Sequence, residues 1–210
     1  MLADWKPDPK YPKLPNGTTK YFLGEEMSLL REMVEMPDCQ PTFSHGGGKV
    51  QPWVVATYAI NSEIELVDFL YCFVRLLKPM VVLETGCFMG FMSYALGRAV
   101  KDNGFGQVVT CDNDLEKVAL TENRVKGLPV TVMGTSALSP EMDEWYAKAD
   151  FAFLDADEDT RPESFKRLRS GCVAVCHDTR QEPWAELIPQ KSDRIVFDET
   201  QKGFTLFRKA

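Results

Sequence analysis

The chain has 210 residues, of which 44% are hydrophobic and 26% charged, enough for one α/β domain with a sizeable buried core. The 24 Lys and Arg residues against 31 Asp and Glu residues give a net charge of -7, which argues against binding to nucleic-acid phosphates or anionic lipid. The apolar runs are far shorter than the ~20 residues of a membrane span, and the N-terminus has no apolar signal-peptide core. We therefore expect a soluble, cytoplasmic protein that binds neither nucleic acid nor membrane.

Residues 1–52 differ in character from the rest of the chain. Four prolines in residues 1–19 predict an extended arm, and apolar residues at helical spacing predict a helix within 22–35. Residues 37–52 combine three prolines with three consecutive glycines, and a loop of that length is typically a lid over a binding site or a flexible connector. We take residues 53–210 as the main domain.

From residue 60 onward, strands and helices alternate regularly. Start signals for helices are the capping boxes of Ser62 with Glu65 and of Thr160 with Glu163, the N-cap Asp114, and Ser139 before Pro140. The predicted strands are 80–83, 108–111, 130–133, 151–154, 172–176, 194–197 and 204–207, and the predicted helices are 62–77, 91–100, 114–127, one from 139 and one from 160. This order predicts an α/β fold with a doubly wound, mostly parallel seven-stranded sheet that ends in an antiparallel hairpin.

Six cysteines are scattered through apolar segments without a CxxC pair. This distribution favours buried, reduced thiols over disulfides or a zinc site.

Polar residues follow five of the predicted strands directly. They are Glu84, Asp112, Gly134-Thr135-Ser136, Asp155 and His177-Asp178. Because ligands of doubly wound sheets bind at the carboxyl ends of the strands, we expect these residues to surround a binding site.

The first strand leads through an acidic residue into a GxxxG turn formed by Gly86 and Gly90. A dinucleotide-binding turn would carry further glycines where this chain has Phe88 and Phe91. Asp112 ends the next strand, where a carboxylate can accept two hydrogen bonds from ribose hydroxyls. The combination predicts a nucleoside cofactor without a pyrophosphate, and S-adenosylmethionine (SAM) is the common one.

Several short motifs together resemble a known family. They are Asn61-Ser62-Glu63, Leu83-Glu84-Thr85-Gly86 with Gly90, Val109-Thr110-Cys111-Asp112, Gly134-Thr135-Ser136-Ala137 and Leu154-Asp155-Ala156-Asp157. With them, residues 61–178 resemble the class I SAM-dependent O-methyltransferases of the catechol and caffeoyl-CoA type, which have a Rossmann-like sheet. The ending Cys176-His177-Asp178-Thr179 is more similar to a related branch that methylates sugars of macrolides.

The resemblance implies roles for individual residues. It places Asp112 at the ribose, Ser136 at the adenine edge and Asp155 beside the sulfonium. The full set of predicted cofactor-binding residues is Glu84, Gly86, Phe88, Gly90, Asp112, Ser136 and Asp155.

The resemblance also implies a divalent metal ion, Mg²⁺ or another, held by Asp155, His177 and Asp178. Such an ion would lower the pKa of the acceptor hydroxyl and orient it. Glu158 departs from the family, which has a lysine there. We therefore predict metal-assisted transfer with His177 and Asp155 as catalytic residues, and keep metal-free transfer with His177 as the general base as the alternative.

The predicted function is methyl transfer from SAM to an oxygen of a small-molecule acceptor. Trp184 is the candidate acceptor-binding residue, because it follows the strand that carries His177 and Asp178. A homodimer is the expected assembly. Two alternatives stay open, a metal-dependent small-molecule hydroxylase on the same fold and a SAM-binding module without catalysis.

Overall fold

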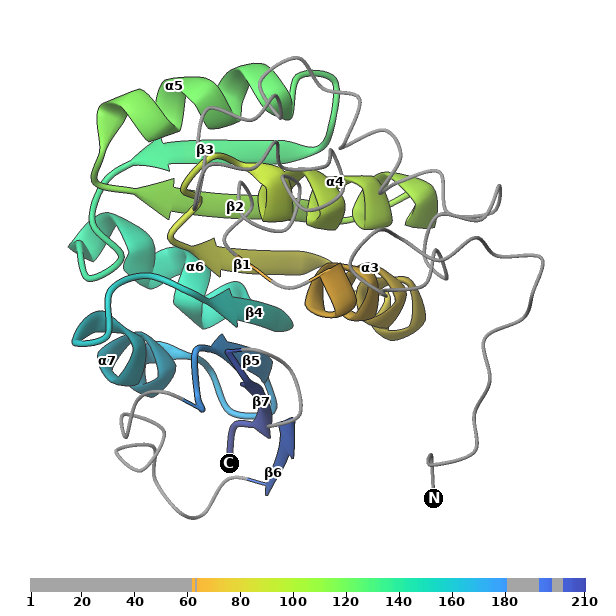
Figure 1. Cartoon of the computed structure of the whole chain (residues 1–210), viewed down its shortest axis with the longest axis vertical. Helices are drawn as coiled ribbons and strands as arrows, with labels where there is room; N and C mark the ends of the chain where they lie inside the picture. The colour runs from red at the N-terminus through yellow and green to blue at the C-terminus, as the bar shows by residue number, and fades with distance from the viewer. Residues whose placement is uncertain (1–61, 63, 181–192, 198–201) are drawn as a thin grey trace, which may run out of the picture. The chain divides into compact units, whose positions relative to one another are not determined.

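Seven strands form one sheet in the computed structural model, in the order β3-β2-β1-β4-β5-β7-β6 (Figure 1). Their bounds are β1 Val81–Thr85, β2 Gln107–Asp112, β3 Val130–Gly134, β4 Phe151–Leu154, β5 Val173–His177, β6 Asp193–Phe197 and β7 Phe204–Arg208. Strands β1 to β5 are parallel, while β7 pairs antiparallel with both β5 and β6. The predicted fold is confirmed, including the C-terminal antiparallel hairpin.

The structure describes residues 62, 64–180, 193–197 and 202–210. The chain divides into two units, Met1–Val55 and Ala56–Ala210, and every described residue belongs to the second. The predicted arm, helix and lid of residues 1–52 lie outside the described residues, as does Trp184.

Helices cover both faces of the sheet (Figure 1). They are α3 Ile64–Leu77, α4 Phe91–Asn103, α5 Leu115–Arg124, α6 Asp143–Lys148 and α7 Thr160–Arg167, with a 3-10 turn, η3 Pro140–Met142, before α6. Helix α4 packs on β2 and α5 on β2 and β3, whereas α6 contacts β1 and α7 contacts β4. Alternate residues of each strand therefore face different helices, which decides where the polar side chains at the strand ends point.

The local start signals of the helices have mixed outcomes. Asp114 caps α5 as predicted, because its side chain accepts hydrogen bonds from the amides of Glu116 and Lys117. Ser139 likewise accepts from the amide of Glu141. The capping box at Ser62 is wrong, since its buried Oγ has no hydrogen-bond partner among the described residues.

The second predicted capping box is also wrong. Thr160 is the first residue of α7 and not its N-cap, which is Asp159. The Thr160 hydroxyl instead donates to the carbonyl of Asp157 at 2.7 Å.

The five described cysteines are free thiols, and Cys87, Cys111, Cys172 and Cys176 are buried. Burial raises the pKa of Cys87, Cys111 and Cys172 to about 12, so these thiols stay protonated and act as small apolar groups.

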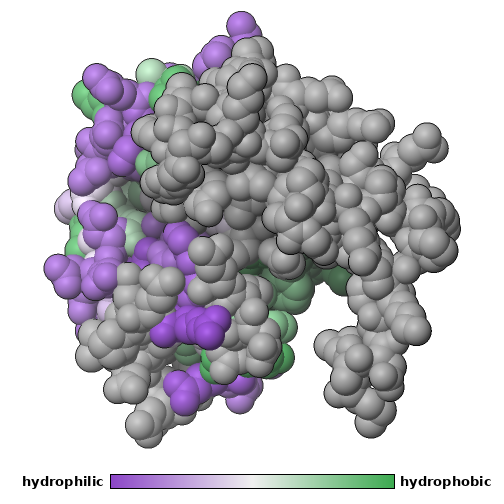
Figure 2. Space-filling model, viewed as in Figure 1, coloured by the Kyte–Doolittle hydropathy of each residue, from purple (hydrophilic) through white to green (hydrophobic). Residues whose placement is uncertain are grey.

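Within the described part of the chain, the helices lack the length and apolar character required to cross a membrane. Figure 2 shows mostly hydrophilic side chains along the edge of the molecule toward which β1, β2 and β3 point. The polar strand ends thus lie on one side of the domain.

Candidate functional site

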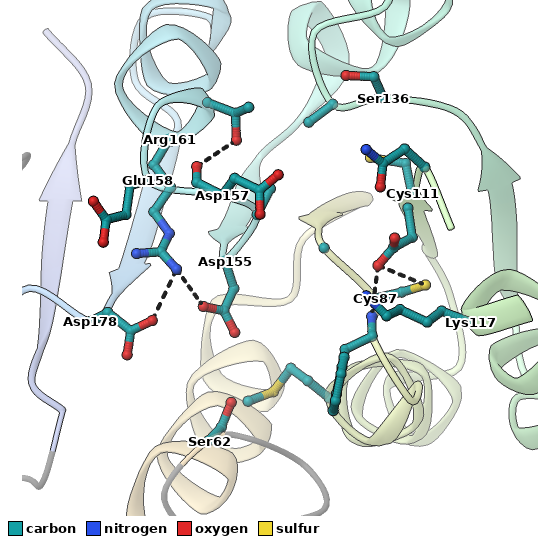
Figure 3. Close-up of a pocket in the computed structure, with 18 residues that line it drawn as sticks. Ser62, Cys87, Cys111, Lys117, Ser136, Asp155, Asp157, Glu158, Arg161 and Asp178 are labelled. Atoms are coloured by element: carbon teal, nitrogen blue, oxygen red, sulfur yellow. Dashed lines mark hydrogen bonds and ion pairs between the residues drawn. The ribbon is translucent and has the colours of Figure 1, made fainter. Parts of the chain in front are cut away.

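A cavity of about 390 Å³ lies at the carboxyl ends of the parallel strands (Figure 3). The strand order reverses between β1 and β4 at this point, which is where doubly wound sheets bind their ligands, and the volume is typical of small-molecule sites. The predicted site residues that line it are Gly86, Phe88, Asp112, Ser136, Asp155 and Asp178. Glu84, Gly90 and His177 are not among its lining residues.

The two glycines of the GxxxG turn have different roles. Gly86 has a φ of +83°, and a Cβ there would lie 2.7 Å from the carbonyl oxygen of Asp155. The loop after β4 can therefore approach this closely only because residue 86 has no side chain. Gly90 has a φ of +77°, and a Cβ there would lie 2.8 Å from Thr121 Oγ1 on α5. Gly86 therefore shapes the cavity wall, while Gly90 allows α4 and α5 to pack closely.

The packing role of Gly90 can be isolated with a matched glycine. Gly104 ends α4 with a φ of +80°, and a Cβ there would meet nothing within 4 Å. Both Gly90→Ala and Gly104→Ala add left-handed strain, but only Gly90→Ala adds a clash. We expect Gly90→Ala to lower the free energy of unfolding by about 1–3 kcal/mol more than Gly104→Ala, measured by urea titration. Equal losses would contradict the packing role.

Asp112 is held rigidly at the end of β2. Its Oδ2 accepts a hydrogen bond from the amide of Phe88 at 3.0 Å, and its Oδ1 accepts from the amide of Asp114 at 3.0 Å. Lys117 lies 5.3 Å from the centroid of the Phe88 ring. Cys87 Sγ, a weak donor, lies 4.0 Å from the same Oδ2. A carboxylate has about four acceptor positions, so Asp112 retains acceptor capacity for hydroxyls in the cavity.

Glu84 lies at the end of β1 and is fully buried. Ser93 on α4 donates a hydrogen bond to its Oε2, and its Oε1 has no partner among the described residues. Removal from water raises the pKa of Glu84 to about 7. Because this carboxylate does not line the cavity, its contact with a cofactor stays a prediction.

Asp155, at the end of β4, is the centre of a charged network (Figure 3). Its Oδ1 lies 3.0 Å from His177 Nδ1 and 3.3 Å from Arg161 Nη2. The same Arg161 nitrogen donates to Asp178 Oδ2 at 2.9 Å. His177 is fully buried, and its Nδ1 also lies 3.7 Å from Asp178 Oδ1, so its ring contacts both carboxylates that line the cavity.

Arg161 is a site residue that sequence reasoning missed. It lies in the first turn of α7, is 5% exposed and lines the cavity. A signal was present, because Arg161 is the only basic residue in the strongly acidic stretch 155–163. A lone cation among five acids is expected to pair with some of them.

Asp178 adopts an unusual backbone conformation. Its φ is 61°, in the left-handed region that only glycine occupies without cost, although Asp and Asn are the next best tolerated. Such strain persists where the surroundings fix it, and it is concentrated at functional sites. The Asp178 carboxylate points toward Arg161 (Figure 3).

The ligand atoms of Asp155, His177 and Asp178 lie within 4.8 Å of one another, and their chemistry is that of a divalent metal site. The two carboxylates, however, already pair with two cations, because Lys202 Nζ lies 3.6 Å from Asp178 Oδ1 and Arg161 joins both. A divalent ion on these oxygens would meet the guanidinium directly. The residues as arranged do not fit the metal ion that the family resemblance implies.

Known proteins support the fold and the type of domain. The family described as "Methyltransferase domain" matches residues 83–179, slightly less than half of the chain. No curated protein sequence matches the chain.

Solved structures of methyltransferases resemble the chain in fold. The O-methyltransferase TomG from Streptomyces achromogenes, involved in tomaymycin synthesis and solved with SAM, is 21% identical with a TM-score of 0.57, over 72% of this chain and 82% of that one. An O-methyltransferase from Bacillus cereus in complex with S-adenosylhomocysteine (SAH) is 17% identical with a TM-score of 0.60, over 87% and 91%. The SAH-bound methyltransferase PaMTH1 from Podospora anserina is 15% identical with a TM-score of 0.62, over 87% and 88%.

The domain match and the fold confirm the resemblance stated from the sequence. Residues 83–179 match the methyltransferase-domain family, and the chain has the fold of O-methyltransferases that were solved with SAM or SAH.

Proposed function

We propose that this chain transfers a methyl group from SAM to an oxygen atom of a small-molecule acceptor. The observation that carries the proposal is the cavity at the strand-order reversal, with the rigidly held Asp112 on one side and the Asp155 network on the other. The SAM and SAH bound to TomG and to the Bacillus cereus enzyme support this choice of cofactor.

The walls of the cavity suit the parts of SAM. Asp112 would accept hydrogen bonds from the two ribose hydroxyls, and Phe88 and Ser136 line the same cavity as candidates to contact the adenine. Among the lining residues, five acids face two cations, Lys117 and Arg161. This negative balance favours the positively charged SAM over its neutral product SAH, and so favours product release.

Asp155 is the residue best placed to accept the proton of the acceptor. Bound SAM supplies an electrophilic methyl group on a sulfonium sulfur. Asp155 Oδ1 is occupied by His177 and Arg161, whereas its Oδ2 has no partner among the described residues. Oδ2 can therefore take the hydroxyl proton, while the fixed carboxylate aligns the acceptor oxygen for in-line attack.

His177 then acts on Asp155 and not on the acceptor. The ring is fully buried and lies beside the Phe153 ring, tilted by 38°, with 6.2 Å between the ring centroids. Through the contact between its Nδ1 and Asp155 Oδ1, the buried ring fixes the orientation of the Asp155 carboxylate. The prediction of His177 as the direct general base is therefore replaced in this proposal by Asp155 with His177 behind it.

The two alternatives from the sequence make different demands. A hydroxylase would require a redox metal on Asp155, His177 and Asp178, and the bridging Arg161 argues against one. A SAM-binding module without catalysis would bind SAH but never turn over. A small-molecule acceptor and a homodimer stay predictions.

The cofactor site can be tested by calorimetric titration with SAH. Asp112→Ala removes charged hydrogen-bond acceptors, so SAH affinity should fall about 10- to 100-fold, or ~1–3 kcal/mol. Glu122→Gln, which removes a negative charge from the exposed side of α5, is the matched control and should bind like the wild type. Unchanged affinity in Asp112→Ala would overturn the cofactor assignment.

A further inference from the structure

We propose that Arg161 is the resident cation of the Asp155–Asp178 carboxylate pair and occupies the position that the family resemblance gives to a divalent metal ion. The inference deepens the proposed function, on which it rests, by making the methyl transfer independent of metal. Arg161 is a positioning residue in this scheme, because it acts on the acceptor through Asp155.

The first support is geometric. A single nitrogen, Arg161 Nη2, lies 3.3 Å from Asp155 Oδ1 and 2.9 Å from Asp178 Oδ2. Figure 3 shows the guanidinium between the two carboxylates. An ion that used oxygens of both acids would have to displace this buried side chain, which is only 5% exposed. Arginine cannot yield the position by losing its proton, because it is always charged in proteins.

The second support is the balance of charge. Asp155 and Asp178 contribute two negative charges, and Arg161 and Lys202 contribute two positive ones within 4 Å of them. A carboxylate pair without cations would repel itself and attract a divalent ion. Because side chains already balance both charges of the pair, these two carboxylates attract a divalent ion less than an unpaired pair would.

The third support is the placement of charge along the chain. Glu158 stands where the resembled family has a lysine, and the nearest cation, Arg161, follows three residues later. Both residues line the cavity. In this chain the cation therefore stands in the first turn of α7, from which the arginine side chain reaches both carboxylates.

The arrangement gives Arg161 a definite task. By binding Asp155 Oδ1 together with His177, it fixes the carboxylate and leaves Oδ2 for the acceptor hydroxyl. By binding Asp178, it ties the loop after β5 to α7 across the cavity edge. Loss of the guanidinium should therefore free the carboxylate pair to bind a metal ion.

The experiment is a Mn²⁺ titration of the full chain, followed by electron paramagnetic resonance. We expect the wild type to show no stoichiometric Mn²⁺ binding at the Asp155–Asp178 pair. Arg161→Gln should bind one Mn²⁺ at least tenfold more tightly, and Asp178→Asn added to it should abolish the gain. Asn is suited to the left-handed backbone at position 178. Arg161→Lys restores a cation and should return Mn²⁺ binding toward the wild type.

Three controls distinguish an effect of Arg161 on Mn²⁺ binding from a general charge effect, from misfolding and from a failure of the proposed function. Lys166→Gln makes the same charge change on the exposed side of α7 and should leave Mn²⁺ binding unchanged. Circular dichroism reports folding of each variant. The Mn²⁺ titration needs no cofactor, so absence of SAH binding by the wild type would overturn the proposed function alone.

Two outcomes would overturn the inference. One is that the wild type binds one equivalent of Mn²⁺ and that Asp155→Asn abolishes this binding. This outcome would be decisive even if Arg161→Gln did not fold. The other is a folded Arg161→Gln that binds Mn²⁺ no better than the wild type. As a readout on turnover, wild-type methyl transfer should keep its rate after exhaustive dialysis against a chelator.

Discussion

Asp155→Asn is expected to slow methyl transfer by about 10²- to 10⁴-fold, the usual contribution of a positioned general base. The amide is nearly isosteric with the carboxylate but cannot take the acceptor proton, and its NH₂ group cannot accept from Arg161 or His177. The rate constant of a single turnover, measured with radiolabelled SAM and an acceptor that the wild type methylates, reports the chemical step.

The matched control is Asp157→Asn. Asp157 lines the same cavity and carries the same charge, but its side chain is exposed and outside the Asp155 network. It should keep a rate within a few-fold of the wild type. A rate for Asp155→Asn that also lies within a few-fold would show that Asp155 positions the site without accepting the proton.

The shared role of Asp155 in proton transfer and in the Arg161 ion pair also predicts non-additivity. Asp155→Asn and Arg161→Gln act on one network with direct contact, so the loss of rate in the double variant should be smaller than the product of the single losses. If the loss of rate in the double variant equalled the product of the single losses, Arg161 would not act through Asp155 in catalysis.

The sheet and the position of the site could be predicted because their signals are local. Apolar runs that alternate with helical segments predicted the strands and helices of a parallel sheet. Because ligands bind at the carboxyl ends of parallel strands, Asp112, Asp155 and Asp178 were predicted to lie at one site. All three line the cavity. No long-range contact had to be known for these placements.

The roles within the site depend on contacts that the sequence does not reveal. Gly86 and Gly90 belong to one motif, yet the first faces the loop after β4 and the second faces α5. His177 follows the same rule as Asp178, but the alternation of β5 buries its ring and leaves the next carboxylate in the cavity. The pairing of Arg161 depends on the reach of a long side chain across two loops.

Glu84 is a second buried carboxylate, and its effect is expected on stability. Burial raises its pKa to about 7 in the folded protein from 4.5 in the unfolded chain. Between these two values the folded state holds a proton that the unfolded state has released, so stability falls as the pH rises through this window. Above about pH 7 the ionised carboxylate is fully destabilising, by roughly 3 kcal/mol at 1.36 kcal/mol per pKa unit.

Glu84→Gln removes this titration while keeping an oxygen that can accept from Ser93. We expect the variant to gain stability relative to the wild type on going from pH 5 to pH 8, by about 2–3 kcal/mol, measured by urea unfolding at both values. Glu122→Gln on the exposed side of α5 should show no such pH-dependent gain. The same relative stability of Glu84→Gln at both pH values would show that the buried carboxyl does not titrate in this range. A carboxylate that costs this much at neutral pH is a candidate for a functional role, and a loss of SAM affinity in the stabilised variant would place that role at the cofactor.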